Sequence, residues 1–179
     1  MILELGCGDG RIASQLCTNR TVVGTDLSLR GLRLCSNSIM RVQSDIRQIP
    51  LADHSFDLVL CCEVLEHLPN TAFKSALREI DRLARKYVLV SVPYRENLLE
   101  GSVQCPECDR PFHVYGHLRS FDEGFFERLL PGFNLRVTWK FGPTSHWLSR
   151  LRGLRRMTSG GGTCLHCKAQ SQQLVDCRN

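Results

Sequence analysis

The first group of residues suited to chemistry is a glycine-rich loop close to the N-terminus. Gly6, Gly8 and Gly10 follow a short apolar stretch and precede a helix-like one. Such glycines let a backbone turn tightly and approach a ligand without interference from a Cβ atom. The spacing is not that of a dinucleotide-binding loop, G-x-G-x-x-G, because Arg11 stands where the third glycine would be. Asp9 would also place a carboxylate beside a pyrophosphate, where two negative charges repel, so the loop favours a ligand without phosphate.

Two further acids follow apolar stretches in the same manner. Asp26 comes just after Thr21–Gly24, where a carboxylate can accept hydrogen bonds from both hydroxyls of a ribose. Asp45 follows Met40–Gln43 and is placed to meet the edge of an adenine. S-adenosylmethionine carries a sulfonium and an ammonium group but no phosphate, so it tolerates nearby acids. The residues therefore favour S-adenosylmethionine over NAD as the cofactor.

The second group consists of cysteines, of which the chain of 179 residues has ten. Four of them form two C-x-x-C pairs, Cys105/Cys108 and Cys164/Cys167, separated by residues 109–163. In a cytosolic protein such pairs favour metal ligation over disulfides, and four thiolates suit a structural tetrahedral zinc site without an open position for catalysis. The positions after the second cysteines hold Asp and Lys where glycine is usual. Unpaired thiols and a redox disulfide are the alternative interpretations.

Strands are expected to alternate with helices over the first 92 residues, and these elements would position the residues named above. Alternation of this kind predicts an α/β fold with a doubly wound, mostly parallel, Rossmann-like sheet. The run Phe56–Cys62 is apolar except for Asp57, as is typical of strands buried on both faces. Apolar residues at helical spacing predict an amphipathic helix over Phe73–Lys86. The other expected elements are strands at Met1–Leu5, Thr21–Gly24, Met40–Gln43 and Tyr87–Val92, and helices over Arg11–Thr18 and from Ser28.

The pattern changes after Pro93. Residues 94–120 form a loop-rich insertion that holds the first cysteine pair. A helix is expected over Phe121–Leu130 with Ser120 as its cap, and alternating apolar residues predict a strand over Asn134–Phe141. We expect one domain that binds S-adenosylmethionine over residues 1–145, and a basic tail over 146–179 that carries the second cysteine pair.

Four segments together resemble a known family. ILELGCGDG, VVGTDLS, QSDIRQIPLADHSFDLVLCCEVLEHLPN and YVLVSVP stand in the order and spacing of class I S-adenosylmethionine-dependent methyltransferases, in particular the type 11 group. The resemblance is close over residues 1–92 and looser over 121–141. The family has a helix before the first strand that covers the methionine end of the cofactor. The sequence begins inside that strand, so this cover is expected to be missing or supplied by a partner.

The resemblance implies a role for each residue of the cofactor site. The acid of the first strand and the glycine loop hold the methionine part, the acid after the second strand binds the ribose, and the acid after the third strand contacts the adenine amino group. These roles map to Glu4, Gly6, Gly8 and Gly10, to Asp26, and to Asp45 with Ile46 packing on the adenine ring.

The methyl acceptor requires groups of its own. Transfer to a hydroxyl needs a base, and His67, after the fourth expected strand, is the first candidate, although a structural hydrogen bond would also explain it. In the loop after the fifth strand, Tyr94, His113, His117 and Arg119 are candidates for acceptor contacts, and the two histidines are alternatively metal ligands or solvated.

The expected activity is methyl transfer to a hydroxyl or amine of a small-molecule or glycan-type acceptor. From position 136 onward the chain has eight basic residues and one acid, a charge of +7, so an RNA methyltransferase using this tail and the zinc element is an alternative. No Asn-Pro-Pro-Tyr motif supports base methylation. A catalytically silent cofactor-binding protein is the other alternative. No apolar run approaches the roughly 20 residues of a membrane span, and no secretion signal is visible, so a cytoplasmic location is expected.

Overall fold

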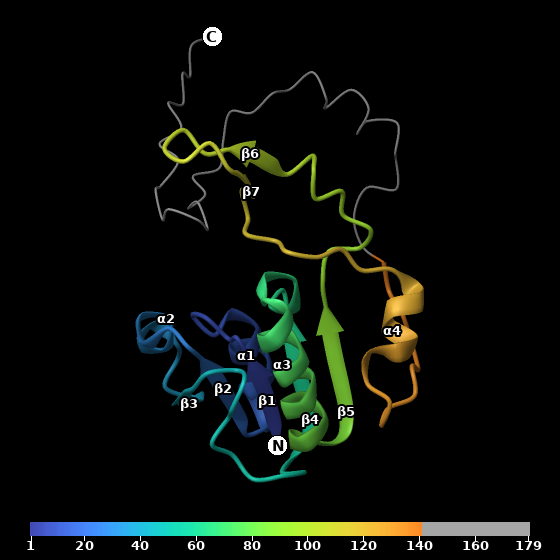
Figure 1. Ribbon diagram of the computed structural model, residues 1–179. Coiled ribbons are helices and arrows are strands. Elements are labelled where there is room, and N and C mark those ends of the chain that lie inside the picture. The colour runs from blue at the N-terminus through green and yellow to red at the C-terminus, as the bar shows by residue number, and fades with distance from the viewer. Residues whose placement is uncertain (141–179) are drawn as a thin grey trace. The chain divides into compact units, whose positions relative to one another are not determined.

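The computed structural model describes residues 1–140, except the side chains of 126–128, and divides the chain into two compact units (Figure 1). The first unit comprises Met1–Pro93 and Phe121–Arg136. The second comprises Tyr94–Ser120 and, of the remaining described residues, Val137–Lys140. The basic tail at 146–179, with Cys164 and Cys167, lies outside the described residues.

The first unit is built on a five-stranded sheet in which every neighbouring pair is parallel. The strand order is β3-β2-β1-β4-β5, so the chain starts in the middle and winds outward to both edges. This arrangement confirms the expected Rossmann-like, doubly wound fold. The strands are β1 (Ile2–Leu5), β2 (Val22–Asp26), β3 (Met40–Gln43), β4 (Phe56–Cys62) and β5 (Ala84–Ser91).

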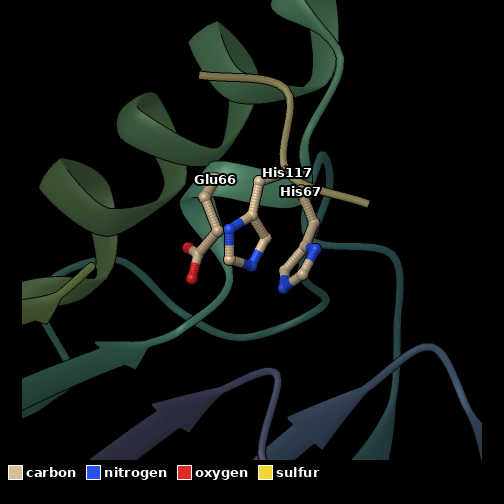
Figure 2. Close-up of side chains that lie close together, drawn as sticks. All are labelled: Glu66, His67 and His117. Carbon is tan, nitrogen blue, oxygen red and sulfur yellow. The ribbon is translucent and has the colours of Figure 1, made fainter. Parts of the chain in front are cut away.

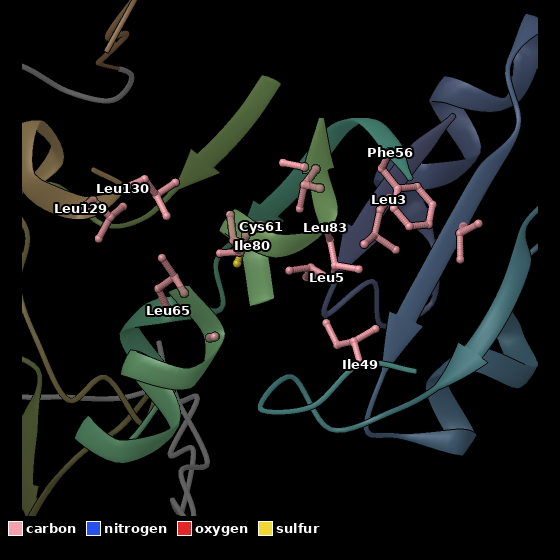
Figure 3. Close-up of a cluster of buried hydrophobic side chains, with 14 of the residues drawn as sticks. Leu3, Leu5, Ile49, Phe56, Cys61, Leu65, Ile80, Leu83, Leu129 and Leu130 are labelled. Atoms are coloured by element: carbon pink, nitrogen blue, oxygen red, sulfur yellow. The ribbon is translucent and has the colours of Figure 1, made fainter. Parts of the chain in front are cut away.

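Helices cover both faces of this sheet, because its central strands are apolar on both sides. Leu3 and Leu5 of β1 pack into one core cluster with Ile80 of α3 (Asn70–Leu83). Figure 3 shows this cluster reaching Leu129 at the end of α4 (Glu123–Leu129). Alternate residues of the strands, such as Ile2 and Leu60, instead join a second cluster with residues of the helices on the opposite face. Those helices are α1 (Arg11–Leu16), which continues into the 3-10 turn η1 (Cys17–Asn19), and α2 (Leu29–Leu34).

The register of the strands brings their carboxyl ends to one edge of the sheet. Glu4 of β1 is opposite Gly24 of β2 and Leu60 of β4. Asp26, at the end of β2, is opposite Gln43 of β3. The acids expected to bind the cofactor therefore follow neighbouring strands at the edge where ligands of open α/β sheets bind.

The boundary between α3 and β5 differs from the expectation. The helix ends at Leu83, and Ala84 is already extended (φ −78°, ψ 130°) and paired with Phe56 of β4. Pairing with a neighbouring strand thus overrides the helical spacing that the sequence continues to Lys86. The strand is also less buried than expected, since Tyr87 is 64% exposed. The reason is that β5 is the edge strand of the described sheet.

Two further expectations near α4 are wrong. The helix is capped by Asp122, whose side chain accepts a hydrogen bond from the backbone N–H of Phe125 at 2.9 Å, and not by Ser120. Residues 134–140, the described part of the expected strand Asn134–Phe141, form no strand. Alternating apolar residues do not suffice for a strand when no neighbouring strand pairs with them.

The second unit contains a small hairpin that the sequence did not indicate. β6 (Ser102–Gln104) pairs antiparallel with β7 (Pro111–His113), and the first cysteine pair lies in the connecting loop. Cys105 of this loop and Phe112 of β7 form a small buried cluster. The three-residue strands were too short to show alternation, so the segment was expected to be a loop.

Candidate functional site

The glycine loop follows β1 directly and adopts a backbone that only glycine accepts readily. Gly6, Gly8 and Gly10 have φ values of +68°, +54° and +76°, in the left-handed region. A Cβ atom on Gly6 would lie 2.5 Å from Val64 Cγ2, whereas one on Gly8 would meet nothing within 4 Å. The loop is therefore packed against the protein at its start and open above Gly8. An open backbone of this kind can lie directly against a ligand.

Asp26 ties this loop to the end of β2. One carboxylate oxygen, Oδ2, accepts the backbone N–H of Gly8 at 2.8 Å, and the other, Oδ1, accepts the N–H of Ser28 at 2.7 Å. A carboxylate has about four acceptor positions, so two remain for a ligand. Ser28 also caps α2 by accepting the N–H of Gly31, which fixes the turn after β2. The arrangement suits a pair of hydroxyl donors such as those of a ribose.

Glu4 is the most unusual acid of the site. Its residue is 3% exposed, and its Oε2 atom has no hydrogen-bond partner among the residues that the structure describes. Burial, as the main cause, together with the negative charges of Asp26 and Asp9, raises the pKa of Glu4 to about 7, while the backbone N–H of Ala13 acts in the opposite direction. A buried carboxyl group among other acids is stabilised by a cationic ligand. The ammonium and sulfonium groups of S-adenosylmethionine meet this requirement.

Asp45 is placed after β3 as expected, but its carboxylate already has a partner. Arg47 binds both oxygens through Nε and Nη2 at 2.6–2.9 Å, and this hydrogen bonding holds the pKa of Asp45 below its usual value. Ile46, half-buried, packs against the core cluster below. Ile46, expected to pack on an adenine ring, is thus held by the core, whereas an adenine amino group would have to share Asp45 with Arg47.

The segment after β4 carries the candidate base. His67 ends the 3-10 turn η2 (Leu65–His67) and is exposed, whereas its neighbour Glu66 is fully buried. Figure 2 shows the side chains of both residues. Just before the turn, Glu63 has a φ of +55°, and its side chain accepts a hydrogen bond from the Ser91 hydroxyl at the end of β5. Strained non-glycine residues cluster at ligand sites, and this one lies at the carboxyl edge of the sheet. Glu63 and Glu66 could not be recognised from the sequence, because neither backbone strain nor burial is visible there.

The four acceptor candidates all belong to the second unit or its border. His113 and His117 stack with ring centroids 4.8 Å apart, and both approach Glu96, a residue that the sequence analysis had not singled out. Tyr94 lies under the Lys140 ammonium group, 4.4 Å from its ring centroid. Arg119 is partly buried, which lowers its pKa from the usual value.

The first cysteine pair adopts a tight turn. The backbone N–H of Asp109 donates to the carbonyl of Cys105 at 2.9 Å, and Asp109 has a φ of +54°. Aspartate is among the few non-glycine residues that tolerate this conformation, so it replaces the glycine usual at this position. Cys105 is buried and Cys108 is half-buried. The other two cysteines of the expected zinc site lie outside the described residues.

Comparison with known proteins agrees with the fold and the loop. The family model described as a methyltransferase domain matches residues 3–90. A probable S-adenosylmethionine-dependent methyltransferase of Mycobacterium tuberculosis is 33% identical over 106 residues, 56% of this chain and 38% of that protein. A ubiquinone biosynthesis O-methyltransferase of Albidiferax ferrireducens is 28% identical over 149 residues, 68% of this chain and 58% of that protein.

An uncharacterized protein of Methanocaldococcus jannaschii is 30% identical over 105 residues, which cover 58% of this chain. The chain spans 45% of that relative and 38% of the mycobacterial one. Among solved structures, a SAM-dependent methyltransferase from Methanosarcina mazei is similar with a TM-score of 0.59 and 18% identity, covering 72% of this chain and 76% of the other. That likeness concerns the fold alone. Within the described residues, no helix is both long and apolar enough to cross a bilayer.

Proposed function

We propose that this protein is a class I S-adenosylmethionine-dependent methyltransferase that transfers the methyl group to a hydroxyl or amine of a small-molecule or glycan-type acceptor. The methyltransferase-domain model that matches residues 3–90 and the similarity to a probable S-adenosylmethionine-dependent methyltransferase support this proposal. The observation that carries the proposal is the pair of acids flanking the glycine loop. Glu4 is buried with a partnerless oxygen among the described residues, and Asp26 keeps two acceptor positions. Together they fit a ligand that is cationic at one end and carries two hydroxyls at the other.

Each part of the cofactor has a counterpart in the site. Glu4 and the open backbone at Gly8 would hold the methionine end, and Asp26 would accept the ribose hydroxyls. Ile46 would pack on the adenine ring, with Asp45 accepting from its amino group in exchange for part of its contact with Arg47. The bound cofactor supplies an electrophilic methyl group on a sulfonium. The chain's own contribution is to orient that methyl group and to exclude water from it.

His67 is the residue proposed to take the acceptor proton. It is exposed on the turn after β4, at the edge of the sheet where the cofactor acids lie. An imidazole is suited to this role because its ordinary pKa is close to neutral pH. A hydroxyl acceptor is supported by the relative from Albidiferax, whose name states an O-methyltransferase. An amine acceptor would need the base less.

We also propose that Cys105 and Cys108, with Cys164 and Cys167, hold a structural zinc ion. The support is the left-handed conformation of Asp109, which closes the turn between the first two cysteines as a glycine would. Replacing Cys105 and Cys108 by serine would remove the thiolate-to-metal absorption of the Co²⁺-loaded protein. Retention of that absorption would contradict this assignment.

The acceptor class is tested by labelling. The full chain is incubated with S-adenosylmethionine carrying a radiolabelled methyl group and a cell extract separated into glycan, small-molecule, RNA and protein fractions. We expect label in the glycan or small-molecule fraction, and none with a Glu4→Gln/Asp26→Asn double variant. Label confined to RNA would replace the proposed acceptor with a nucleic acid, and binding without any label would indicate a silent cofactor-binding protein.

A further inference from the structure

The segment 94–120 brings together three side chains that bind metals in other proteins: Glu96, His113 and His117. Each offers a ligand atom that lies within 4.8 Å of those of the other two. The Glu96 carboxylate approaches one nitrogen of each imidazole, with Oε2 2.6 Å from His117 Nδ1 and Oε1 3.5 Å from His113 Nε2. All three residues belong to the second unit, and none of them is a cysteine of the C-x-x-C pairs.

The backbone around the cluster holds the two histidines in place. His113 ends β7, and the chain then turns at Gly116, whose N–H donates to the His113 carbonyl at 2.9 Å with a φ of +73°. This turn lays the His117 ring over the His113 ring, with 16° between their planes. A Cβ atom on Gly101 would lie 2.0 Å from His113 Nε2. A residue larger than glycine at position 101 would therefore clash with the buried imidazole. The cluster is thus a built site and not a chance encounter of surface side chains.

Two imidazoles and one carboxylate suit a divalent transition metal, and Zn²⁺ in particular. Zinc bonds of about 2.0 Å at tetrahedral angles separate two ligand atoms by about 3.3 Å, close to the distance between Glu96 Oε1 and His113 Nε2. The side chains are also largely removed from solvent, with exposures of 3% for His113, 11% for His117 and 23% for Glu96. We propose that Glu96, His113 and His117 form a Zn²⁺ site distinct from the cysteine pairs. Three protein ligands leave a fourth position for water or another ligand.

The hydrogen bonds indicate how protons move when the ion binds. The backbone N–H of His117 donates to His113 Nδ1 at 3.3 Å, so the proton of neutral His113 is on Nε2, facing Glu96. An ion on Nε2 requires that proton to move to Nδ1, and the bond from the His117 backbone must then open. The proton between His117 Nδ1 and Glu96 is likewise displaced, to His117 Nε2. Zinc binding therefore exchanges the tautomers of both histidines.

This exchange is observable in the unaltered protein. Full-length protein stripped of metal and labelled with ¹⁵N in its histidines is titrated with Zn²⁺ and followed by nuclear magnetic resonance. We expect shifts at His113 Nε2, at His117 Nδ1 and at the His117 backbone amide, with saturation at one equivalent beyond any bound by thiolates. Unchanged signals from both histidines on saturation with Zn²⁺ would overturn the proposal.

Variants separate this site from the cysteines. In a Cys105→Ser/Cys108→Ser chain we expect Co²⁺ to bind still, without thiolate-to-cobalt absorption. In that background Glu96→Gln, His117→Gln and Gly101→Ala should each weaken binding about tenfold or more. His54→Gln, which changes a histidine of the first unit, should leave binding unchanged. Loss of all Co²⁺ binding with the two cysteines, or equal affinity in the Glu96→Gln and His117→Gln variants, would contradict a separate site.

Discussion

At the scale of single residues, Glu4 combines a cost in stability with a use in binding. The unfolded chain releases the Glu4 proton near its ordinary pKa of 4.5, whereas the folded chain keeps it to about 7. Between these values the folded state holds the extra proton, so stability falls as the pH rises from 4.5 to 7, and the loss persists above 7. A bound cation would offset this cost. Above pH 4.5 the residue is therefore unfavourable for the fold without a ligand, and in the proposed complex the cationic cofactor would reduce this cost.

Glu4→Gln tests this relation in both directions. At pH 8 the variant should be more stable than the unaltered chain by about 1–3 kcal/mol, because each pKa unit corresponds to about 1.4 kcal/mol. Its stability should also depend less on pH between 5 and 8. The same variant should bind S-adenosylmethionine more weakly. Urea unfolding at pH 5 and at pH 8 measures the stability, and calorimetry at the same two pH values measures the affinity for the cofactor.

Glu107→Gln is the matched control for this substitution, since Glu107 is exposed and lies in the second unit. It should change neither stability nor cofactor affinity. A Glu4→Gln protein that was less stable than the unaltered chain at pH 8 would show that the Glu4 carboxylate is well solvated or paired in solution.

Asp26 is the second residue with a specific expectation. In Asp26→Asn one of the two carboxylate oxygens becomes an amide donor, so the bond from either Gly8 or Ser28 is lost along with one acceptor position for the ribose. Because hydrogen bonds to charged groups contribute about 1.5–3 kcal/mol, affinity for S-adenosylmethionine should fall about 10- to 100-fold by calorimetry. Asp57→Asn is the control. Asp57 makes ion pairs with Arg85 and Lys86 at the opposite end of β4, and its loss should leave the affinity unchanged.

At the scale of elements, the ends of helices and strands were predicted less well than their centres. The strands β3 and β4 have the expected bounds, and α1 begins at the expected residue. The end of α3 and the cap of α4 were wrong, because each depends on a competition between neighbouring residues. Ala84 joins β5 by pairing with β4, and Asp122 outcompetes Ser120 for the first turn of α4.

The cap of α4 gives a direct test. Asp122→Ala removes the acceptor of the Phe125 N–H and should destabilise the first unit by about 1 kcal/mol, a typical value for loss of an N-cap. The midpoint of urea unfolding measures the change. Ser120→Ala, two residues away, should have almost no effect. Equal effects of the two substitutions would mean that the Asp122 contact does not stabilise the helix in solution.

At the scale of the whole molecule, the charge of the chain bears on the acceptor. The net charge is +5, and the residues from 136 onward contribute +7. An anionic polymer would be attracted to such a chain, and its affinity would fall steeply with salt. A small-molecule or glycan-type acceptor without many phosphates would not show this dependence.

Salt dependence of the reaction is therefore informative. With the acceptor found by labelling, the ratio kcat/KM should change less than about threefold between roughly 50 and 200 mM salt, a range over which proteins that contact several phosphates lose about 10³-fold or more in affinity. Steady-state rates at several salt concentrations measure it. A steep decrease would favour an RNA acceptor instead.

The sequence by itself determined the order of strands and helices along the chain and the α/β class. It was also sufficient to recognise the glycine loop and Asp26 as parts of the candidate site. These features are visible because they rest on local patterns: apolar runs, glycines at fixed spacing, and acids that follow strands. Only the tertiary structure decided that Glu4 is buried with an oxygen lacking a partner among the described residues. It also decided that Arg47 pairs with Asp45, and that Glu96 approaches both His113 and His117. Burial and pairing depend on residues far apart in the chain, and a single sequence does not show which of them meet.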